Sequence, residues 1–350
     1  FFSVCAMAAR TAQQTWEANN KVEKVVDDEI YKLDTAAQQQ ILNQRPWKSD
    51  NKHFKDVRMS ALALLKIQMH TGSEVKPGQV PLEVMGMLQG KIDGHTIIVT
   101  DSFALPIPAG MDRGATHVNP GQEAMEYMVQ YTELIKDVGK RENVVGWYHS
   151  HPGYGCWMSG IDVSTQRTQQ QFNDPFLAVV VDPVRSIGAG KVEIGAFRTF
   201  PEGYTTNSRE ASEWQSVPSD RVEDFGVHAN CYYQLEMSFY KSSLDARLLD
   251  LQWRKYWVNT LAASPLTSNR DYITSQISDV AEKIEKAEGE MGHGRYAGLN
   301  LVPADKRKKE EESQLSKATR DTNKVTIEVL HGLSRQVLKA ALFNAAPPRQ

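Results

Sequence analysis

The segment GWYHSHPGYGCWMSGID, residues 146–162, contains side chains that bind metal ions. His149 and His151 flank Ser150, and on a β-strand residues i and i+2 point to the same face. Two neutral imidazoles at this spacing can bind one zinc ion, with Zn–N bonds of about 2.0–2.1 Å. We therefore predict that both histidines project together from a strand that ends at Pro152.

An aspartate follows the histidines at a position where a helix should begin. Ser159 stands where an N-cap is expected, and Asp162 then occupies position N3 of the first turn. A carboxylate there can face back toward the end of the preceding strand. His149, His151 and Asp162 then give the two-histidine, one-carboxylate ligand set of catalytic zinc sites, which lowers the pKa of a bound water to about 7.

A hydrolytic metal site also needs a base that takes a proton and passes it to the leaving amine. Glu83 is the strongest candidate, because it is a carboxylate within the apolar segment PLEVMGML, residues 81–88, which we expect to form a strand. A buried carboxylate costs free energy unless it is paired or used. The alternative is a glutamate on an edge strand that faces water.

Each half of this arrangement also has a structural explanation. Ser-x-x-Asp is a capping sequence that needs no metal, and two histidines on a strand can both be hydrogen-bonded in a core. The presence of all three ligands in one short segment favours the metal site. Cys156 lies in the same segment, but the ligand set is complete without it, so we interpret it as a buried structural thiol.

The composition argues against several classes of partner. Hydrophobic residues make up 41% and charged residues 24% of the 350 residues, and the net charge is −3. We therefore expect no nucleic-acid partner and no membrane partner, and no apolar run reaches the ~18 residues of a membrane span. Three widely spaced cysteines indicate a reducing compartment, so we expect a protein of the cytoplasm and nucleus.

Helices and strands alternate from about residue 54 to residue 200, which predicts an α/β fold. The expected elements are a helix over 56–72, a hairpin turning at Asp93-Gly94, a helix over 122–139, a strand over 143–152, a helix from 159, and buried strands over 175–183 and 191–200.

We divide the chain into three regions by composition. Residues 1–50 form a polar N-terminal arm with a helix-like run at 21–33, and residues 51–225 form the α/β domain, with insertions near 106–122 and 201–222. Residues 226–350 are expected to be helical, over 232–261, over 271–291 and in a last amphipathic helix. One face of that last helix carries Val325, Val329, Leu333, Val337 and Leu338.

The residues Glu83, His149-Ser-His-Pro and Ser159-x-x-Asp162 resemble the motif of the JAMM (MPN+) metalloproteases, with all positions present. Further segments are similar to the branch of this family that serves the COP9 signalosome: RPWKSDNKHFK, DSFALP, PFLAVVVDP, GKVEIGAFRTFP, EDFGVH and YKSSLDARLLDLQWRKYWVNTL. The likeness covers about residues 15–290. It implies an MPN (JAMM) domain with a central mixed, mostly antiparallel sheet flanked by helices, plus an N-terminal arm and C-terminal helices.

The resemblance also implies an activity. One zinc ion would be bound by His149, His151 and Asp162, Glu83 would act as general base and then acid, and Ser159 would hold the oxyanion. The reaction would be deneddylation, the hydrolysis of an isopeptide bond between a ubiquitin-like modifier and a cullin lysine. Partners would be the other signalosome subunits, through a shared bundle of C-terminal helices, and neddylated cullin-RING ligases.

Three alternatives stay open on the sequence. Ser159 could serve mainly as a helix cap. The chain could be a deubiquitinase of the same fold, which the extent of the resemblance argues against, or a scaffold with a vestigial metal site, which the complete motif argues against. The loop 108–119 departs from the relatives, in which an acid and an arginine there are linked to inactivity of the free subunit. We hypothesise that Asp112 or His117 makes an altered inhibitory contact.

Overall fold

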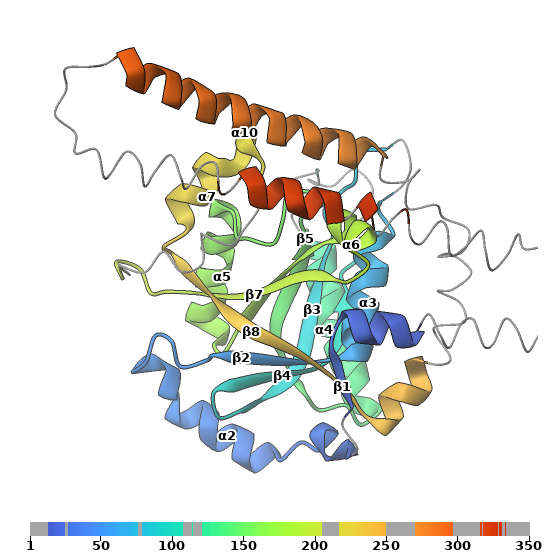
Figure 1. Ribbon diagram of the computed structural model, residues 1–350. Helices are drawn as coiled ribbons and strands as arrows, with labels where there is room; N and C mark the ends of the chain where they lie inside the picture. Colours follow the sequence, from blue (N-terminus) through green and yellow to red (C-terminus); the bar gives the residue numbers. More distant parts are fainter. Residues whose placement is uncertain are drawn as a thin grey trace, which may run out of the picture.

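The computed structural model describes residues 13–24, 27–75, 79–107, 114, 121–204, 217–249, 270–296, 316, 318–327, 329, 330 and 333. Within these residues the strands form one mixed sheet (Figure 1). They are β1 (Val22–Lys24), β2 (Asp56–Ser60), β3 (Met85–Asp93), β4 (Thr96–Ala104), β5 (Asn143–Ser150), β6 (Leu177–Asp182), β7 (Glu193–Thr199) and β8 (Tyr232–Lys241).

The sheet closes on itself. Its order is β1-β8-β2-β4-β3-β5-β6-β7, and β7 also pairs with β8, so the strands from β2 to β8 form a ring. Strand β3 is antiparallel to β4 and β5, β6 and β8 are antiparallel to β7, and the pairs β5–β6, β2–β4, β2–β8 and β1–β8 are parallel. The predicted α/β fold with a mixed sheet is confirmed.

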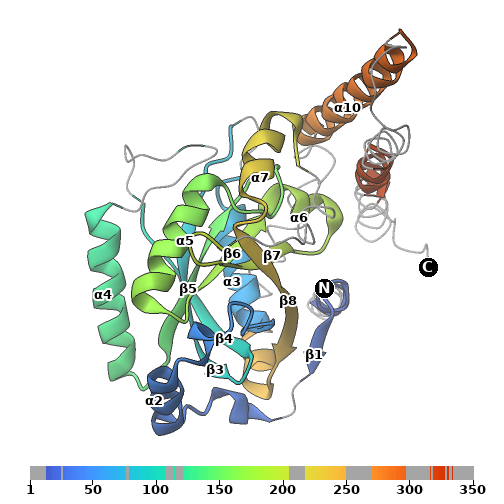
Figure 2. The ribbon, with the colours of Figure 1, turned by 90° about the vertical axis from the view of Figure 1, so that its left-hand side faces the viewer.

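Helices lie on both faces of this sheet. The helices with assigned bounds are α2 (Thr35–Gln44), α3 (Ala61–Gly72), α4 (Gln122–Asp137), α5 (Gly160–Asn173), α6 (Pro183–Ala189), α7 (Val222–His228) and α10 (Arg270–Tyr296), with short 3-10 helices η1 (Asp28–Tyr31), η2 (Pro46–Lys48) and η3 (Ser219–Arg221). Residues 13–19, 243–249 and 318–327 are also helical, and α10 lies against η3. Helix α3 contacts β2, β4, β5, β6 and β8, whereas α5 contacts β7 and α7 (Figure 2). No helix in the described parts of the chain is long and apolar enough to cross a membrane.

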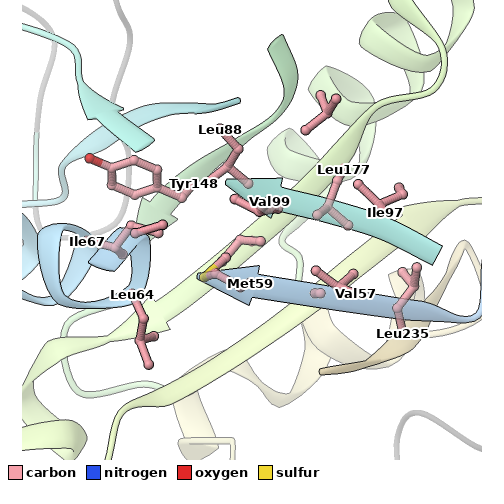
Figure 3. Packing of buried hydrophobic residues seen from close by; sticks show 14 of the residues in the cluster. Val57, Met59, Leu64, Ile67, Leu88, Ile97, Val99, Tyr148, Leu177 and Leu235 are labelled. Atoms are coloured by element: carbon pink, nitrogen blue, oxygen red, sulfur yellow. The ribbon is translucent and has the colours of Figure 1, made fainter. Parts of the chain in front are cut away.

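Alternation along the strands produces two hydrophobic layers. Around α3, Leu64 and Ile67 pack against side chains from several strands, shown in Figure 3: Val57, Met59, Leu88, Ile97, Val99, Tyr148, Leu177 and Leu235. The opposite layer contains Met85, Met87, Leu105, Trp147, Val163, Phe176 and Phe197. Consecutive residues Trp147 and Tyr148 of β5 therefore lie in different layers, as strand geometry requires.

The helix predicted over 56–72 is wrong in its first five residues. Residues 56–60 form β2, because they pair with β4 on one side and β8 on the other. The helix begins after Ser60, whose hydroxyl oxygen accepts a hydrogen bond from the Leu62 backbone N–H at 3.1 Å. Pairing with distant strands overrides the helical spacing of the apolar residues.

Two further predictions of helix were wrong. Residues 232–241 form β8 rather than the start of a helix, and the helix-like run at 21–33 contains β1 and η1. Residues 13–19 of the arm are helical, and a second helix, α2, begins after Asp34, whose carboxylate accepts from Ala37 N at 3.0 Å. The predicted hairpin, α4, β6 and β7 were correct within a few residues.

Both flanks of residues 51–225 contribute to the sheet, because β1 lies before them and β8 after them. The division at residues 50 and 225 itself stays a prediction. The C-terminal α10 extends along the top of Figure 1, beside helical residues of the segment 316–333. Val337 and Leu338 of the predicted last helix lie outside the described residues.

Candidate metal centre

Strand β5 delivers the two histidines to one face. His149 lies on the same side as Trp147, while the Tyr148 hydroxyl points the other way and lies 2.9 Å from His70 Nδ1 on α3. His151 follows the strand, and its backbone N–H donates to the carbonyl of Val181 at 2.8 Å. Both imidazoles are buried, so the pair predicted from the His-x-His spacing faces the interior on the side of α5.

Helix α5 delivers the aspartate. Ser159 is its N-cap and Asp162 its N3 residue, and their side chains and backbone N–H groups form a reciprocal capping box. The Ser159 backbone N–H and hydroxyl both donate to Asp162 Oδ2, at 2.8 and 2.7 Å. This holds the carboxylate against the end of β5, as the Ser-x-x-Asp spacing predicts.

The three predicted ligands converge. The Nε2 atoms of His149 and His151 lie 3.1 Å apart, and Asp162 Oδ1 and Oδ2 lie 3.3 and 3.4 Å from them, respectively. Ligand atoms bound tetrahedrally at zinc distances of about 2.0–2.1 Å are separated by about 3.3–3.4 Å. The donor atoms therefore fit a zinc ion, and in the described residues these side chains are the one His/Cys/Asp/Glu group that could hold a metal.

The charges at this point favour a cation. Burial alone would raise the pKa of the Asp162 carboxyl, but His149 and His151 outweigh it and hold that pKa well below its usual range. Burial likewise disfavours the charged imidazole of His149, yet the facing Asp162 carboxylate raises its pKa. The Asp162 carboxylate is thus an anion next to the Nε2 atoms of His149 and His151, which face each other. A divalent ion between these groups would bind all three side chains.

Different contacts orient the two imidazoles. His151 Nδ1 lies 3.0 Å from the carbonyl oxygen of Gly155, and the ring stacks on Tyr154. His149 Nδ1 is buried without a hydrogen-bond partner, and this ring stacks on Trp147 with centroids 4.5 Å apart. The indole N–H of Trp147 in turn donates to Gln166 of α5 at 2.8 Å.

Glu83 lies beside the ligands. It precedes β3 rather than lying within it, which corrects the predicted strand position, and only 3% of its surface is exposed, which excludes a glutamate facing water. The Tyr154 hydroxyl donates to its carboxylate, and the Glu83 backbone N–H donates to the Gly114 carbonyl at 2.9 Å. Burial raises the pKa of Glu83, although His151 and His149 act in the opposite direction.

A cavity of about 1120 Å³ opens onto these residues, because Glu83, Ser159 and Asp162 all line it. Part of its wall is apolar, formed by side chains of β3 and α4: Met85, Met87, Met125, Met128 and Val129. Polar and charged residues, among them Glu133 and Lys136, line other parts. Met125 and Val129 are also partly exposed to solvent, at 42% and 53%. The candidate centre is therefore accessible from an apolar surface between α4 and the sheet.

Cys156 fits its structural interpretation. Its thiol is buried, lies 3.3 Å from the carbonyl oxygen of Glu193, and has a pKa raised by burial. Sequence reasoning missed two residues near the centre, Tyr154 and Asp182. The Asp182-Pro183 pair after a buried strand was a usable signal of a helix cap. The loop residues Asp112 and His117 lie outside the described residues.

Comparison with known proteins gives two matching family models. One is described as JAB1/Mov34/MPN/PAD-1 ubiquitin protease and matches residues 52–175, and the other, Cop9 signalosome subunit 5 C-terminal domain, matches residues 262–344. The chain is also 51% identical to COP9 signalosome complex subunit 5 of Oryza sativa subsp. japonica, covering 97% of this chain and 93% of the relative. The chain belongs to the COP9 signalosome subunit 5 family.

Other members of the COP9 signalosome subunit 5 family are equally similar. Subunit 5a of Arabidopsis thaliana is 52% identical over 96% of this chain and 92% of its own, and subunit 5 of Dictyostelium discoideum is 52% identical over 96% of both. The ubiquitin protease match contains Glu83, the three ligands and Ser159. The family's C-terminal match contains all of α10.

Proposed function

We propose that this chain is the catalytic subunit of a COP9 signalosome and hydrolyses the isopeptide bond between a neddylation modifier and a cullin lysine. The observation that carries the proposal is the convergence of His149, His151 and Asp162, with donor atoms 3.1–3.4 Å apart, beside the buried carboxylate of Glu83. Membership of a family matched to a ubiquitin protease model supports the isopeptidase class.

Each group of residues at the site would have a separate role in the reaction. A zinc ion held by the three ligands would polarise the scissile carbonyl and make water a nucleophile near neutral pH. Glu83 would accept the proton from the attacking water and donate it to the leaving lysine amine, and its raised pKa suits both steps. Ser159 would donate its hydroxyl proton to the oxyanion, which requires it to release Asp162 Oδ2.

The surroundings of the site support a polypeptide substrate. The methionine-lined cavity would give the modifier segment next to the scissile bond an apolar surface, and α4 would form its outer wall. Neddylated cullin-RING ligases are the proposed substrates, and we place the reaction in the cytoplasm and nucleus. The thiols of Cys156 and Cys231, free in the structure, are consistent with those reducing compartments.

The C-terminal helices support assembly with the other signalosome subunits. Ile277 and Ile284 of α10 are 58% and 40% exposed, and the helical residues Ile327, Leu330 and Leu333 are about half exposed as well. Apolar side chains gathered on helices in this way are typical of surfaces covered by another protein. We propose that they enter a helical bundle shared among subunits.

The test compares cleavage of a neddylated cullin by the chain assembled with its partner subunits, with ubiquitin chains assayed in parallel. Asp162→Asn should lose both bound zinc and activity. Glu83→Gln should keep about one zinc per chain and lose activity by about 10²–10⁴-fold, the size of a general-base contribution. Zinc content is measured by atomic emission.

Three results would overturn the proposal. They are cleavage that persists after zinc is chelated, a preference for ubiquitin chains over the neddylated cullin, and full activity of Glu83→Gln with zinc bound. The second would indicate a deubiquitinase of the same fold.

A further inference from the structure

A buried carboxylate with no contact to the candidate ligands lies beneath the turn that connects them. Asp182 is the last residue of β6 and is 0% exposed. The turn above it comprises residues 152–155, between His151 and Cys156. Gly153 and Gly155 both have positive φ, +91° and +92°, so the turn depends on glycine at these positions.

Three backbone N–H groups donate to this carboxylate, and the Arg185 guanidinium lies beside it. Oδ1 accepts from the backbone N–H of Gly153 at 3.0 Å and of Arg185 at 2.9 Å. Oδ2 accepts from the backbone N–H of Gly155 at 2.9 Å and lies 3.3 Å from Arg185 Nε. Both glycines of the turn are therefore held by one side chain, one on each oxygen.

The turn 152–155 also orients His151. The carbonyl oxygen of Gly155 lies 3.0 Å from His151 Nδ1, and a carbonyl can only accept, so Nδ1 carries the hydrogen. Nε2 is then left with its lone pair directed at His149 Nε2 and Asp162, the position in which a neutral imidazole binds a metal. The Gly155 peptide thus links the carboxylate, through its N–H, to the imidazole, through its carbonyl.

We infer that Asp182 is a positioning residue of the metal centre, which fixes the tautomer and the orientation of His151 through the Gly155 peptide. Groups that orient a metal-binding histidine in this way are worth about 10–100-fold in metal affinity. His149 has no such support, since its Nδ1 is unpaired in the structure. The supporting contacts on the histidines are therefore concentrated on His151.

The variant Asp182→Asn tests this link. All four groups facing the carboxylate are donors, so an amide can satisfy only one side. With its oxygen toward Gly153 it keeps the cap of α6 but turns its NH₂ group against the Gly155 N–H. Zinc affinity of the full chain, measured by competition with a chelator, should fall by about 10–100-fold.

Asp34→Asn is the matched control. Asp34 is also a helix N-cap, accepting from Ala37 N at 3.0 Å, but it lies on α2, with no contact to the centre. Its melting temperature reports the cost of the substitution at a cap, and its zinc affinity should equal that of the unaltered chain. If Asp182→Asn lowers the melting temperature of the zinc-free chain without weakening zinc binding, its role is structural and the inference is wrong.

A second measurement needs no Asp182 variant. In the zinc-free chain with ¹⁵N-labelled histidine, NMR should show His151 as the Nδ1–H tautomer, with its signal assigned by loss in His151→Asn. The Nε2–H tautomer would overturn the inference. Because the inference rests on the proposed metal centre, an unaltered chain that binds no zinc would contradict the proposed function, whereas an unaltered affinity in Asp182→Asn would contradict only the role of Asp182.

Discussion

Ser159 takes part in two arrangements that use the same hydroxyl. As a cap it accepts from the Asp162 backbone N–H at 3.3 Å, and as a donor it gives its one proton to Asp162 Oδ2 at 2.7 Å. The proposed oxyanion contact needs that proton, whereas the cap needs only the oxygen. Substitution can therefore separate the two roles.

We expect Ser159→Asn and Ser159→Ala both to reduce cullin deneddylation by about 10²–10³-fold, because neither offers the hydroxyl. Asparagine still caps a helix, so only the alanine variant should also lose about 0.5–2 kcal/mol in urea unfolding. An alanine variant that keeps the activity of the unaltered chain would mean that Ser159 acts as a cap alone.

The convergence of the three candidate ligands was predictable because their relation is local. Strand alternation places His149 beside His151, and a capping turn aims Asp162, so both follow from short spacings. The apolar neighbours of Glu83 suggested that it is buried, but its burial depends on residues that are distant in the sequence. The contacts of Tyr154 and Asp182 were not predictable, because Tyr154 meets Glu83 from 71 residues away and Asp182 meets Gly155 from 27.

At the scale of elements, one buried aspartate ties α4 and α3 to the sheet. Asp101 of β4 pairs with Lys66 of α3 at 2.6 Å and with Lys140, which follows α4. Burial raises the pKa of Asp101, but the two lysines outweigh it, so its pKa lies below the ordinary value. The pairing therefore holds the chain just after α4 against β4.

Asp101→Asn should lower the free energy of unfolding by about 1–2 kcal/mol at pH 7. Removing one partner of a fully buried ion pair costs about 3–5 kcal/mol, and the cost is smaller here because Lys140 is 48% exposed. A carboxyl with a lowered folded pKa stabilises above its unfolded pKa of about 3.9, and this contribution is lost as pH falls through the folded value. The difference from the variant should therefore shrink below about pH 4.

Urea unfolding across this pH range measures the effect, with Asp137→Asn as control. Asp137 is the last residue of α4 and is exposed, so its replacement should change the free energy of unfolding by less than about 0.5 kcal/mol. A difference between Asp101→Asn and the unaltered chain that persists unchanged at pH 3 would contradict the ion-pair explanation.

The wrong helix predictions share a physical cause. In β8, Tyr232, Leu235 and Phe239 fall at helical spacing, yet the segment is a strand because β1, β2 and β7 all pair with it. A strand with several partners is specified by residues far along the chain, so local periodicity cannot identify it. By contrast, the hairpin of β3 and β4 was predicted from its own Asp93-Gly94 turn.

At the scale of the molecule, contacts connect the C-terminal helices to the turn 152–155, which lies between the candidate ligands. Lys283 of α10 donates to the Val217 carbonyl at 3.0 Å and pairs with Asp279 at 2.7 Å and Asp321 at 2.8 Å. Asp279 also accepts from the Ser219 N–H at 2.8 Å. The segment that these contacts hold, residues 217–228, packs on the turn.

Three contacts make that packing. Val217 and Phe225 cluster with the buried indole of Trp157, and the Arg221 guanidinium lies over the Tyr154 ring. The carboxylate of Asp224 accepts from the Gly160 N–H at 3.3 Å, at the start of α5. A continuous set of contacts therefore connects α10 to residues that flank the candidate ligands.

We expect Lys283→Met to speed hydrogen exchange severalfold in residues 217–228 and in the turn 152–155, because it keeps the side-chain stem and removes the ammonium group. Lys286→Met is the control, since Lys286 is 60% exposed and, among the described residues, pairs with Glu282 of the same helix. Exchange mass spectrometry measures both. Faster exchange confined to α10 would show that the contacts do not couple the two regions.

The closed ring of strands suggests an order in which the parts of the candidate centre come together during folding. His149, His151 and Asp162 lie within fourteen consecutive residues, so their convergence closes a short loop at low entropic cost. Glu83 joins them only when β3 pairs with β5, which closes a loop of more than sixty residues. A folding chain should therefore bring the three candidate ligands together before Glu83 reaches them, so the proposed catalytic site would be complete only when the ring has closed.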